Sequence, residues 1–181
     1  INPQHPIQQR ILAVFAEMCN IPQQQVQVGT DGCSAPNFAV PLYHAALGYA
    51  RLCDPSGGQV SPLHRVTACQ RITQAMMAHP YLVGGPGRFD THLMEAGKGQ
   101  ILSKTGAEGY QGIGLMPGLL SKDSPGVGIA VKISDGDSRG KVSAAVSLEV
   151  LRQLGALSDD AIKALSDFGP TLPLKNFRQI L

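Results

Sequence analysis

The hydrophobic and polar residues of this chain follow two different periods. Up to about residue 96, apolar residues recur every three or four positions, which is the helical period. Between residues 100 and 134 the period becomes two, which is typical of strands, and the helical period then returns. This order predicts helices first, then an antiparallel meander, then a helix that packs back onto it. The expected class is α+β, with helices packed on an antiparallel sheet.

Cap and breaker residues set the expected helix boundaries. Pro6 to about Asn20 should form an amphipathic helix, with one apolar face made of Ile7, Ile11, Val14, Phe15 and Met18. Residues 38–52 are apolar on almost every side, so a buried helix is expected there. A third helix is expected to start at Ser61 and Pro62, its N-cap and first position, and to end before His79–Pro80. Further helices are predicted at 89–96, at 142–154 with Gly155 as its cap, and from Ser158 to before Gly169–Pro170.

Three strands are predicted at 100–104, 109–116 and 127–134, with glycine turns between them. Residues 22–37 are expected to hold one short strand and a structured loop, and 81–90 a glycine-rich turn. The tail 172–181 is interpreted as a last strand or an extended arm. Without a repeat or linker, residues 1–181 are predicted to form a single domain.

Composition excludes several classes of function. The chain has 181 residues, of which 43% are hydrophobic and 15% charged, enough for one domain with a core. The net charge is +2, basic residues are scattered and aromatic residues make up 5%, so no nucleic-acid partner is expected. No apolar stretch approaches the roughly 18 residues of a membrane span, so no membrane association is expected. The four cysteines form no C-x-x-C pair; we expect reduced thiols in a cytoplasmic protein, with a disulfide as the alternative.

The segment 101–106, Ile-Leu-Ser-Lys-Thr-Gly, is the first candidate site. Lys104 could simply be the exposed end of an edge strand. However, K-T-G on a strand, followed by a meander and a returning helix, is typical of penicillin-binding proteins and serine β-lactamases. There the lysine provides positive charge and the glycine lets the substrate approach the backbone. The nucleophile of such a site is a serine in an S-x-x-K box, and the one such box here, Ser138 to Lys141, falls in a turn and is not expected to be catalytic.

The second candidate is the loop Gly-Thr-Asp-Gly-Cys-Ser-Ala-Pro-Asn-Phe, residues 29–38. Asp31 and Gly32 suit a tight turn, and Ser34 or Asn37 could cap the next helix, so a structural role would explain the loop. Cys33 lies in this polar turn, where a thiolate could bind a metal or act as a nucleophile. One cysteine cannot hold zinc, so Cys33 is at most part of a site. The five histidines show no metal-ligand spacing, and we expect them to be structural.

Five blocks of the sequence stand out together: HPIQQR, GTDGCSAPNFAVPLYHAALGYARL, HPYLVGGPGRFDTHLMEA, SKTGAEGYQGIGL and GIAVKISDGDSRGK. In this order they resemble the asparaginase II family of thermolabile, Rhizobium-type L-asparaginases, and the resemblance covers nearly all 181 residues. It implies a fold like that of serine β-lactamases and glutaminases, and hydrolysis of L-asparagine to L-aspartate and ammonia. Members of the family are nearly twice as long, and this chain, which begins with Ile1, is expected to be their C-terminal part.

The resemblance also implies roles for particular residues. Lys104 matches a lysine that partners a serine, and Thr105 and Gly106 are expected to contact the substrate or support the site. Cys33 matches a cysteine that binds zinc together with a cysteine and a lysine of an upstream "CSGKH"-type segment, and Asp31 matches a carboxylate beside it. The serine nucleophile is expected in the missing N-terminal half of the same enzyme, and a homodimer is expected. Two alternatives remain: a non-catalytic domain that retains the fold, and a penicillin-binding or β-lactamase-like acyl-serine enzyme.

Overall fold

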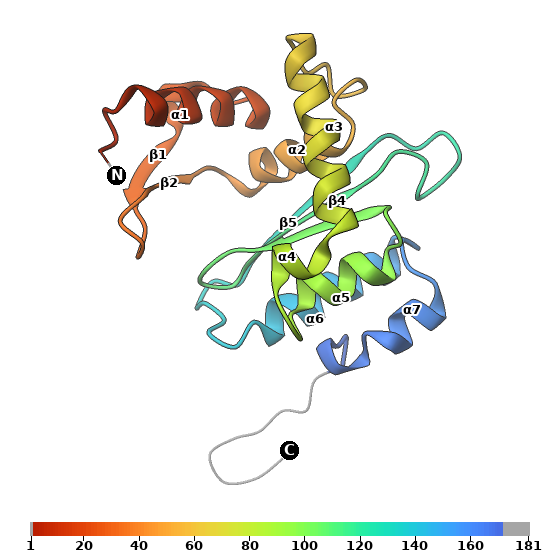
Figure 1. Cartoon of the computed structure of the whole chain (residues 1–181). Coiled ribbons are helices and arrows are strands. Elements are labelled where there is room, and N and C mark those ends of the chain that lie inside the picture. Colours follow the sequence, from red (N-terminus) through yellow and green to blue (C-terminus); the bar gives the residue numbers. More distant parts are fainter. Residues whose placement is uncertain (1, 172–181) are drawn as a thin grey trace, which may run out of the picture.

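The computed structural model describes residues 2–171, so the predicted strand or arm at 172–181 lies outside the described residues (Figure 1). Its helices are α1 (Pro6–Cys19), α2 (Leu42–Cys53), α3 (Leu63–Ala78), α4 (Pro80–Gly84), α5 (Phe89–Ala96), α6 (Lys141–Gln153) and α7 (Asp159–Ala164), with short 3-10 turns at Gln23–Gln25 and Ser166–Phe168. Its strands are β1 (Gln27–Thr30), β2 (Pro36–Ala39), β3 (Ile101–Thr105), β4 (Tyr110–Leu115) and β5 (Val127–Lys132). The α+β class predicted from the pattern is confirmed.

The meander β3–β4–β5 is an antiparallel sheet with β4 in the middle. Because side chains alternate along a strand, one face carries Ile101, Ile113 and Leu115 and the other carries Lys104 and its cross-strand partner Gly112. The first face packs against α5 and α6, and the main core forms there, with Leu93 and Leu148 fully buried. Figure 1 shows these two helices on one side of the sheet and α2 and α3 on the other.

Glycines on the second face let α2 lie close to the sheet. A Cβ atom added at Gly128 would lie 1.7 Å from the Ala46 carbonyl oxygen, and one at Gly112 would lie 2.2 Å from the Tyr49 ring. Any side chain at these positions would push the helix away. These glycines of β4 and β5 are therefore the packing surface for α2.

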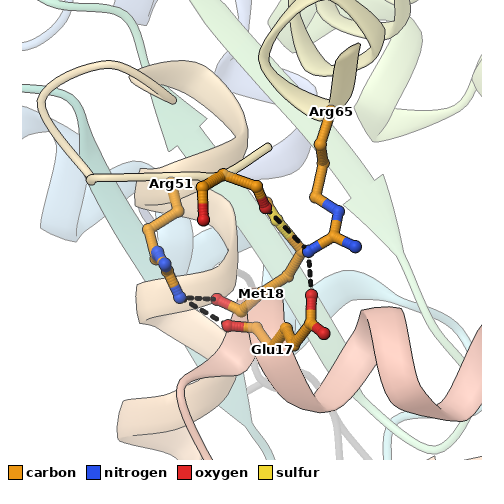
Figure 2. A network of polar contacts seen from close by, with 5 residues as sticks. Glu17, Met18, Arg51 and Arg65 are labelled. Carbon is orange, nitrogen blue, oxygen red and sulfur yellow. Dashed lines mark hydrogen bonds and ion pairs between the residues drawn. The ribbon is translucent and has the colours of Figure 1, made fainter. Parts of the chain in front are cut away.

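Helix α1 and the β1–β2 hairpin form a second, smaller layer with its own core of Leu12, Ala16, Cys19, Ile21 and Val26. Arginines from α2 and α3 hold this layer to the rest of the molecule at the C-terminal end of α1 (Figure 2). Arg51 donates to the carbonyls of Glu17 and Met18, and Arg65 pairs with the Glu17 carboxylate. Cations suit this helix end because its last carbonyls carry partial negative charge.

Several boundaries predicted from the pattern are wrong. The predicted helix at 38–52 begins only at Leu42, because residues 36–39 pair with β1 as a second hairpin strand. That helix is not wholly buried, since Tyr43 is 72% exposed. Ser61 is not an N-cap; Pro62 takes that position, and no side chain caps α3. The first residues of the glycine-rich turn expected at 81–90 belong instead to the short helix α4.

The buried face of α1 also differs from the prediction. The buried residues are Leu12, Ala16 and Cys19, whereas Ile7 and Ile11 are 64% and 46% exposed. The hairpin and α2 pack on the Leu12 side, and helical spacing alone could not show which of two neighbouring apolar stripes would be covered. The predicted helices at 89–96 and 142–154 and the three strands of the meander are confirmed to within two residues.

Candidate functional site

Lys104 and Thr105 are the last two residues of β3, and Gly106 follows the strand. The Lys104 side chain is exposed, and its Nζ donates to the Thr105 carbonyl at 2.8 Å. It lies on the α2 face of the sheet, opposite Gly112 across the strand pair. Lys104 is thus exposed at the end of a strand. This position agrees both with a simple edge-strand lysine and with the lysine of a K-T-G site.

Two tyrosines occupy the same face beside Gly112. The ring of Tyr49, from α2, covers Gly112, and Tyr110 is the first residue of β4. Burial raises the pKa of the Tyr49 phenol well above its ordinary value, and the neighbouring Tyr110 and Asp90 add to the rise. Burial likewise raises the pKa of Tyr110. Both phenols are therefore protonated at neutral pH and act as hydrogen-bonding groups, not as bases.

A buried polar network lies under the K-T-G strand on its other face. The carboxylate of Asp90, from the first turn of α5, accepts from Ser103 Oγ at 2.7 Å and from Gln111 Nε2 at 2.9 Å through Oδ1. Its Oδ2 accepts from the backbone N–H of Thr105 at 2.8 Å. Gln111 completes the ring, donating to Ser103 Oγ at 2.9 Å and accepting from Thr105 Oγ1 at 2.8 Å. Asp90, Ser103 and Gln111 are each at most 2% exposed.

The sequence reasoning missed this network, although a signal was available. Ser103 and Thr105 alternate with Ile101 on the inward face of a strand, and Gln111 alternates with Ile113 on the next strand. Polar residues at inward positions need partners because an unpaired buried polar group costs free energy. That argument predicts a buried polar partner but does not identify Asp90, which comes from a helix.

The predicted site residues Asp31 and Cys33 lie elsewhere, at the tip of the β1–β2 hairpin. Asp31 accepts from the Gly32 N–H at 2.6 Å, and its own N–H donates to the Ala35 carbonyl at 2.9 Å. Ser34 has a left-handed backbone, with φ of 65°, and belongs to this turn; neither it nor Asn37 caps a helix. Figure 1 shows the hairpin projecting away from the three-stranded sheet, so the fold does not bring Cys33 and Lys104 together.

The hairpin does not by itself fit a zinc ion. Cys33 is exposed and free, and within residues 2–171 no three His, Cys, Asp or Glu side chains are close enough to hold a metal. A structural zinc site needs about four ligands. Cys33 could contribute one, so the other ligands would have to come from outside the described part of the chain.

The other cysteines are buried and free, so the alternative of a disulfide pair is not realised. Burial raises the pKa of Cys19 to about 11 and that of Cys53 to about 12, and it also raises the pKa of Cys69. These three thiols pack as small apolar side chains. Cys33 is the exposed one of the four.

The local S-x-x-K box lies before and at the start of α6. Ser138 and Lys141 are exposed and line a surface depression of about 360 Å³ together with Glu108, Asp135 and Arg139. Asp137, between these segments, caps α6 by accepting from the Ser143 N–H at 2.8 Å and the Ser143 hydroxyl at 2.9 Å. The box therefore occupies a helix-capping loop and not a buried helix start.

Fold and site together define the class as an α+β protein, with helices on both faces of an antiparallel sheet and a lysine at the end of its edge strand. The chain belongs to the L-asparaginase II family, whose model matches residues 1–179. Membership of this family indicates an asparaginase-type amidohydrolase acting on a small-molecule substrate. No curated protein sequence matches the chain. No helix within residues 2–171 is long and apolar enough to cross a membrane.

Proposed function

We propose that this chain supplies part of the active site of an enzyme that hydrolyses L-asparagine to L-aspartate and ammonia, with Lys104 as its cationic group. The observation that carries the proposal is the combination of an exposed lysine with a rigidly held strand end. Lys104 is open to solvent, while the peptide that follows it is fixed by a buried network of five hydrogen bonds. Family membership supports the reaction class.

The chemistry requires a nucleophile, a group that moves its proton, and stabilisation of the oxyanion. A serine oxygen attacks the side-chain amide carbon of asparagine, the C–N bond breaks, and ammonia leaves with the transferred proton. Water then hydrolyses the ester to aspartate and regenerates the serine. We assign to Lys104 the proton transfer or the charge stabilisation at that serine, and to Thr105 and Gly106 the strand edge against which substrate lies. Gly106 is exposed and lacks a side chain that would block this approach.

The serine in this scheme is assigned to an upstream part of the same enzyme. Ser103 is the serine closest to Lys104 in sequence, but it is buried on the opposite face and donates to Asp90. The upstream part would also complete a zinc site with Cys33, beside which Asp31 is the site carboxylate, and we propose a homodimer as the assembly. The exposed apolar side chains of α1, Ile7 and Ile11, offer a surface for such contacts.

The test is Lys104→Met in a full-length enzyme that contains this chain, because methionine keeps the aliphatic stem and removes the charged nitrogen. A positioned acid–base group typically contributes about 10²–10⁴-fold, so asparagine turnover should fall by roughly that factor while Tm stays nearly unchanged. Lys122→Met, at an exposed loop lysine, is the matched control and should leave turnover unchanged. A Lys104→Met enzyme that keeps more than about half of its activity would exclude the proposed role.

The acyl-serine alternative uses the same lysine, since K-T-G also occurs in penicillin-binding proteins and β-lactamases. Covalent labelling of the full-length enzyme by a fluorescent penicillin, with no release of ammonia from asparagine, would favour it. Neither labelling nor ammonia release would favour a non-catalytic domain that keeps the fold.

A further inference from the structure

Asp90 is a buried carboxylate without a basic partner. It is 2% exposed, and none of the ion pairs within residues 2–171 involves it. Its two oxygens instead accept three hydrogen bonds from uncharged donors, the Ser103 hydroxyl, the Gln111 amide and the Thr105 backbone N–H. A buried carboxylate is costly unless it is well hydrogen-bonded, so a simple core would contain an apolar residue here. The arrangement therefore calls for a reason other than stability.

The alternation of the strand pair shows why the bond to Thr105 matters. Met116 N donates to Gln100 O and Gly106 N to Tyr110 O, both at 2.9 Å, at the two ends of the β3–β4 pair. Antiparallel pairs alternate, so Lys104 and Gly112 exchange the hydrogen bonds of the ladder, whereas Thr105 directs its N–H and C=O away from β4. Thr105 thus presents both backbone groups at the outer edge of β3. Asp90 takes the N–H, and Lys104 Nζ donates to the C=O.

Asp90 therefore holds the peptide bond that joins Lys104 to Thr105. That bond is planar, so fixing its N–H also fixes the Lys104 carbonyl and limits rotation at the lysine Cα. The hydroxyl of Thr105 is held by Gln111, which is itself bonded to Asp90, so the residue is fixed at two points. None of these groups reaches the face on which the lysine side chain lies.

We propose that Asp90 is a positioning residue of the amidohydrolase site, setting the backbone at the end of β3 from which Lys104 and Gly106 face the substrate. This inference rests on the proposed function. Asp90 acts through the Thr105 N–H and touches neither substrate nor the reacting atoms. The Gln111 amide, which donates to the other carboxylate oxygen, orients the carboxylate toward that N–H.

The test compares Asp90→Asn with Ser103→Ala in the full-length enzyme. In Asp90→Asn one of the two acceptor oxygens is replaced by an NH2 donor. The side chain can then no longer accept both from the Thr105 N–H and from the donors Ser103 and Gln111. A misplacement of about 1 Å costs roughly 10²-fold in rate, so kcat should fall by about 10- to 100-fold while KM changes less than about threefold. Ser103→Ala removes one hydrogen-bond donor to Asp90 but leaves the bond between Asp90 and the Thr105 N–H. Its kcat should therefore stay within about threefold of wild type, although its Tm should fall about as much as that of Asp90→Asn. Equal loss of kcat in the two variants, or none in Asp90→Asn, would overturn the proposal.

A double variant, Asp90→Asn with Gln111→Glu, provides the rescue. The new amide at position 90 can accept from Thr105 N–H through its carbonyl oxygen and donate to the new carboxylate at position 111. That carboxylate can in turn accept from the Ser103 and Thr105 hydroxyls. The kcat of the double variant should be at least about tenfold higher than that of Asp90→Asn alone. A recovery of Tm without a recovery of kcat would assign the network to stability alone.

Amide hydrogen exchange at Thr105 tests the geometry without an activity measurement, even if Asp90→Asn does not fold. In the unmodified protein the Thr105 amide should exchange slowly although it lies on an edge strand, and exchange at the rate of an unstructured peptide would overturn the inference. The outcomes also separate the two proposals. An active Lys104→Met enzyme refutes the proposed function, whereas an inactive Lys104→Met with a fully active, folded Asp90→Asn refutes only the positioning role.

Discussion

At the scale of single residues, the chain places chemically similar side chains in opposite environments. Among the four cysteines, Cys33 is exposed in a hairpin turn, while Cys19, Cys53 and Cys69 are buried among apolar side chains. Sequence alone marked Cys33 as the unusual one because it lies in a polar turn, and the exposure agrees. Its role as a metal ligand stays a prediction.

The thiols should differ sharply in reactivity. Thiolate is the reactive form, and burial raises the pKa of the other three cysteines, so their thiols are both protonated and inaccessible at pH 8. We expect a chromogenic thiol reagent to label one cysteine rapidly in the native protein and all four in denaturant. Cys33→Ser should abolish the fast phase. Two or more fast thiols in the native protein would show that a buried cysteine is accessible.

The same contrast applies to the lysine and the carboxylate at the K-T-G strand. Lys104 was recognisable from its motif, whereas Asp90 belongs to no motif and was not singled out. The two are next to the same peptide bond but on opposite faces of the sheet. Only the side-chain alternation of β3 and the packing of α5 connect them.

At the scale of elements, the caps and connections position the helices. Arg51 from α2 bonds the last carbonyls of α1, and His44 Nδ1 lies 2.8 Å from the Cys19 carbonyl oxygen (Figure 2 shows the arginines). These contacts tie the layer that carries Cys33 to the helix that covers the sheet. They join segments that are more than twenty residues apart, so local sequence patterns did not predict them.

The start of α6 is an element whose stability should depend on pH. Asp137 is partly buried, which would raise its pKa, but hydrogen bonds from Ser143, Lys141 and Val142 outweigh this and hold the pKa below its ordinary value. A carboxylate with a lowered pKa stabilises the fold above about pH 3.8, its ordinary value, and that stabilisation is lost as pH falls through the lowered value. Asp137→Asn keeps one acceptor oxygen and removes the charge, so it should cost roughly 0.3–1 kcal/mol near neutral pH, which is typical of a carboxylate at a helix N-terminus.

Urea unfolding at several pH values measures this effect. The difference between the free energies of unfolding of wild type and Asp137→Asn should be constant from pH 7 to about pH 4 and shrink below it. Asp135→Asn, at an exposed neighbour in the same loop, is the control and should show little difference at any pH. A difference for Asp137 that persists undiminished to pH 2 would mean that its charge is not what caps the helix.

At the scale of the whole molecule, the candidate groups occupy two separate layers. Lys104 lies on the three-stranded sheet and Cys33 on the projecting hairpin, and several large apolar side chains are exposed, including Leu63 and Leu82 on α3 and α4. The separation of the two candidate groups agrees with the proposal that the active site is completed by an upstream part.

The isolated chain of 181 residues should accordingly release ammonia from asparagine no faster than a heat-treated control. The physical reason is that Ser103 is buried against Asp90 and that Ser138 lies in the capping loop of α6. An enzyme-coupled ammonia assay on the purified chain makes the measurement. Activity clearly above the control, and lost in Ser138→Ala, would instead assign catalysis to the local S-x-x-K box.

The sequence by itself determined the α+β class, the order of most elements, the strand that carries Lys104 and the polar turn that carries Cys33. These follow from local periods and turn chemistry, which depend on neighbouring residues only. Helix boundaries went wrong where a long-range partner decided them, as at residues 38–39, which pair with β1 instead of starting α2. The buried face of α1 likewise depends on the residues that pack against Leu12, and the helical period of apolar residues alone did not predict it.

Only the tertiary structure decided how the site is supported. Asp90, Ser103 and Gln111 come from a helix and two strands, and no spacing in the sequence brings them together. Burial makes their mutual hydrogen bonding obligatory, because an unpaired carboxylate or amide in the core would cost more than the chain could offset. The local pattern thus placed Lys104 on its strand, whereas the packing of α5 on the sheet placed a carboxylate behind it.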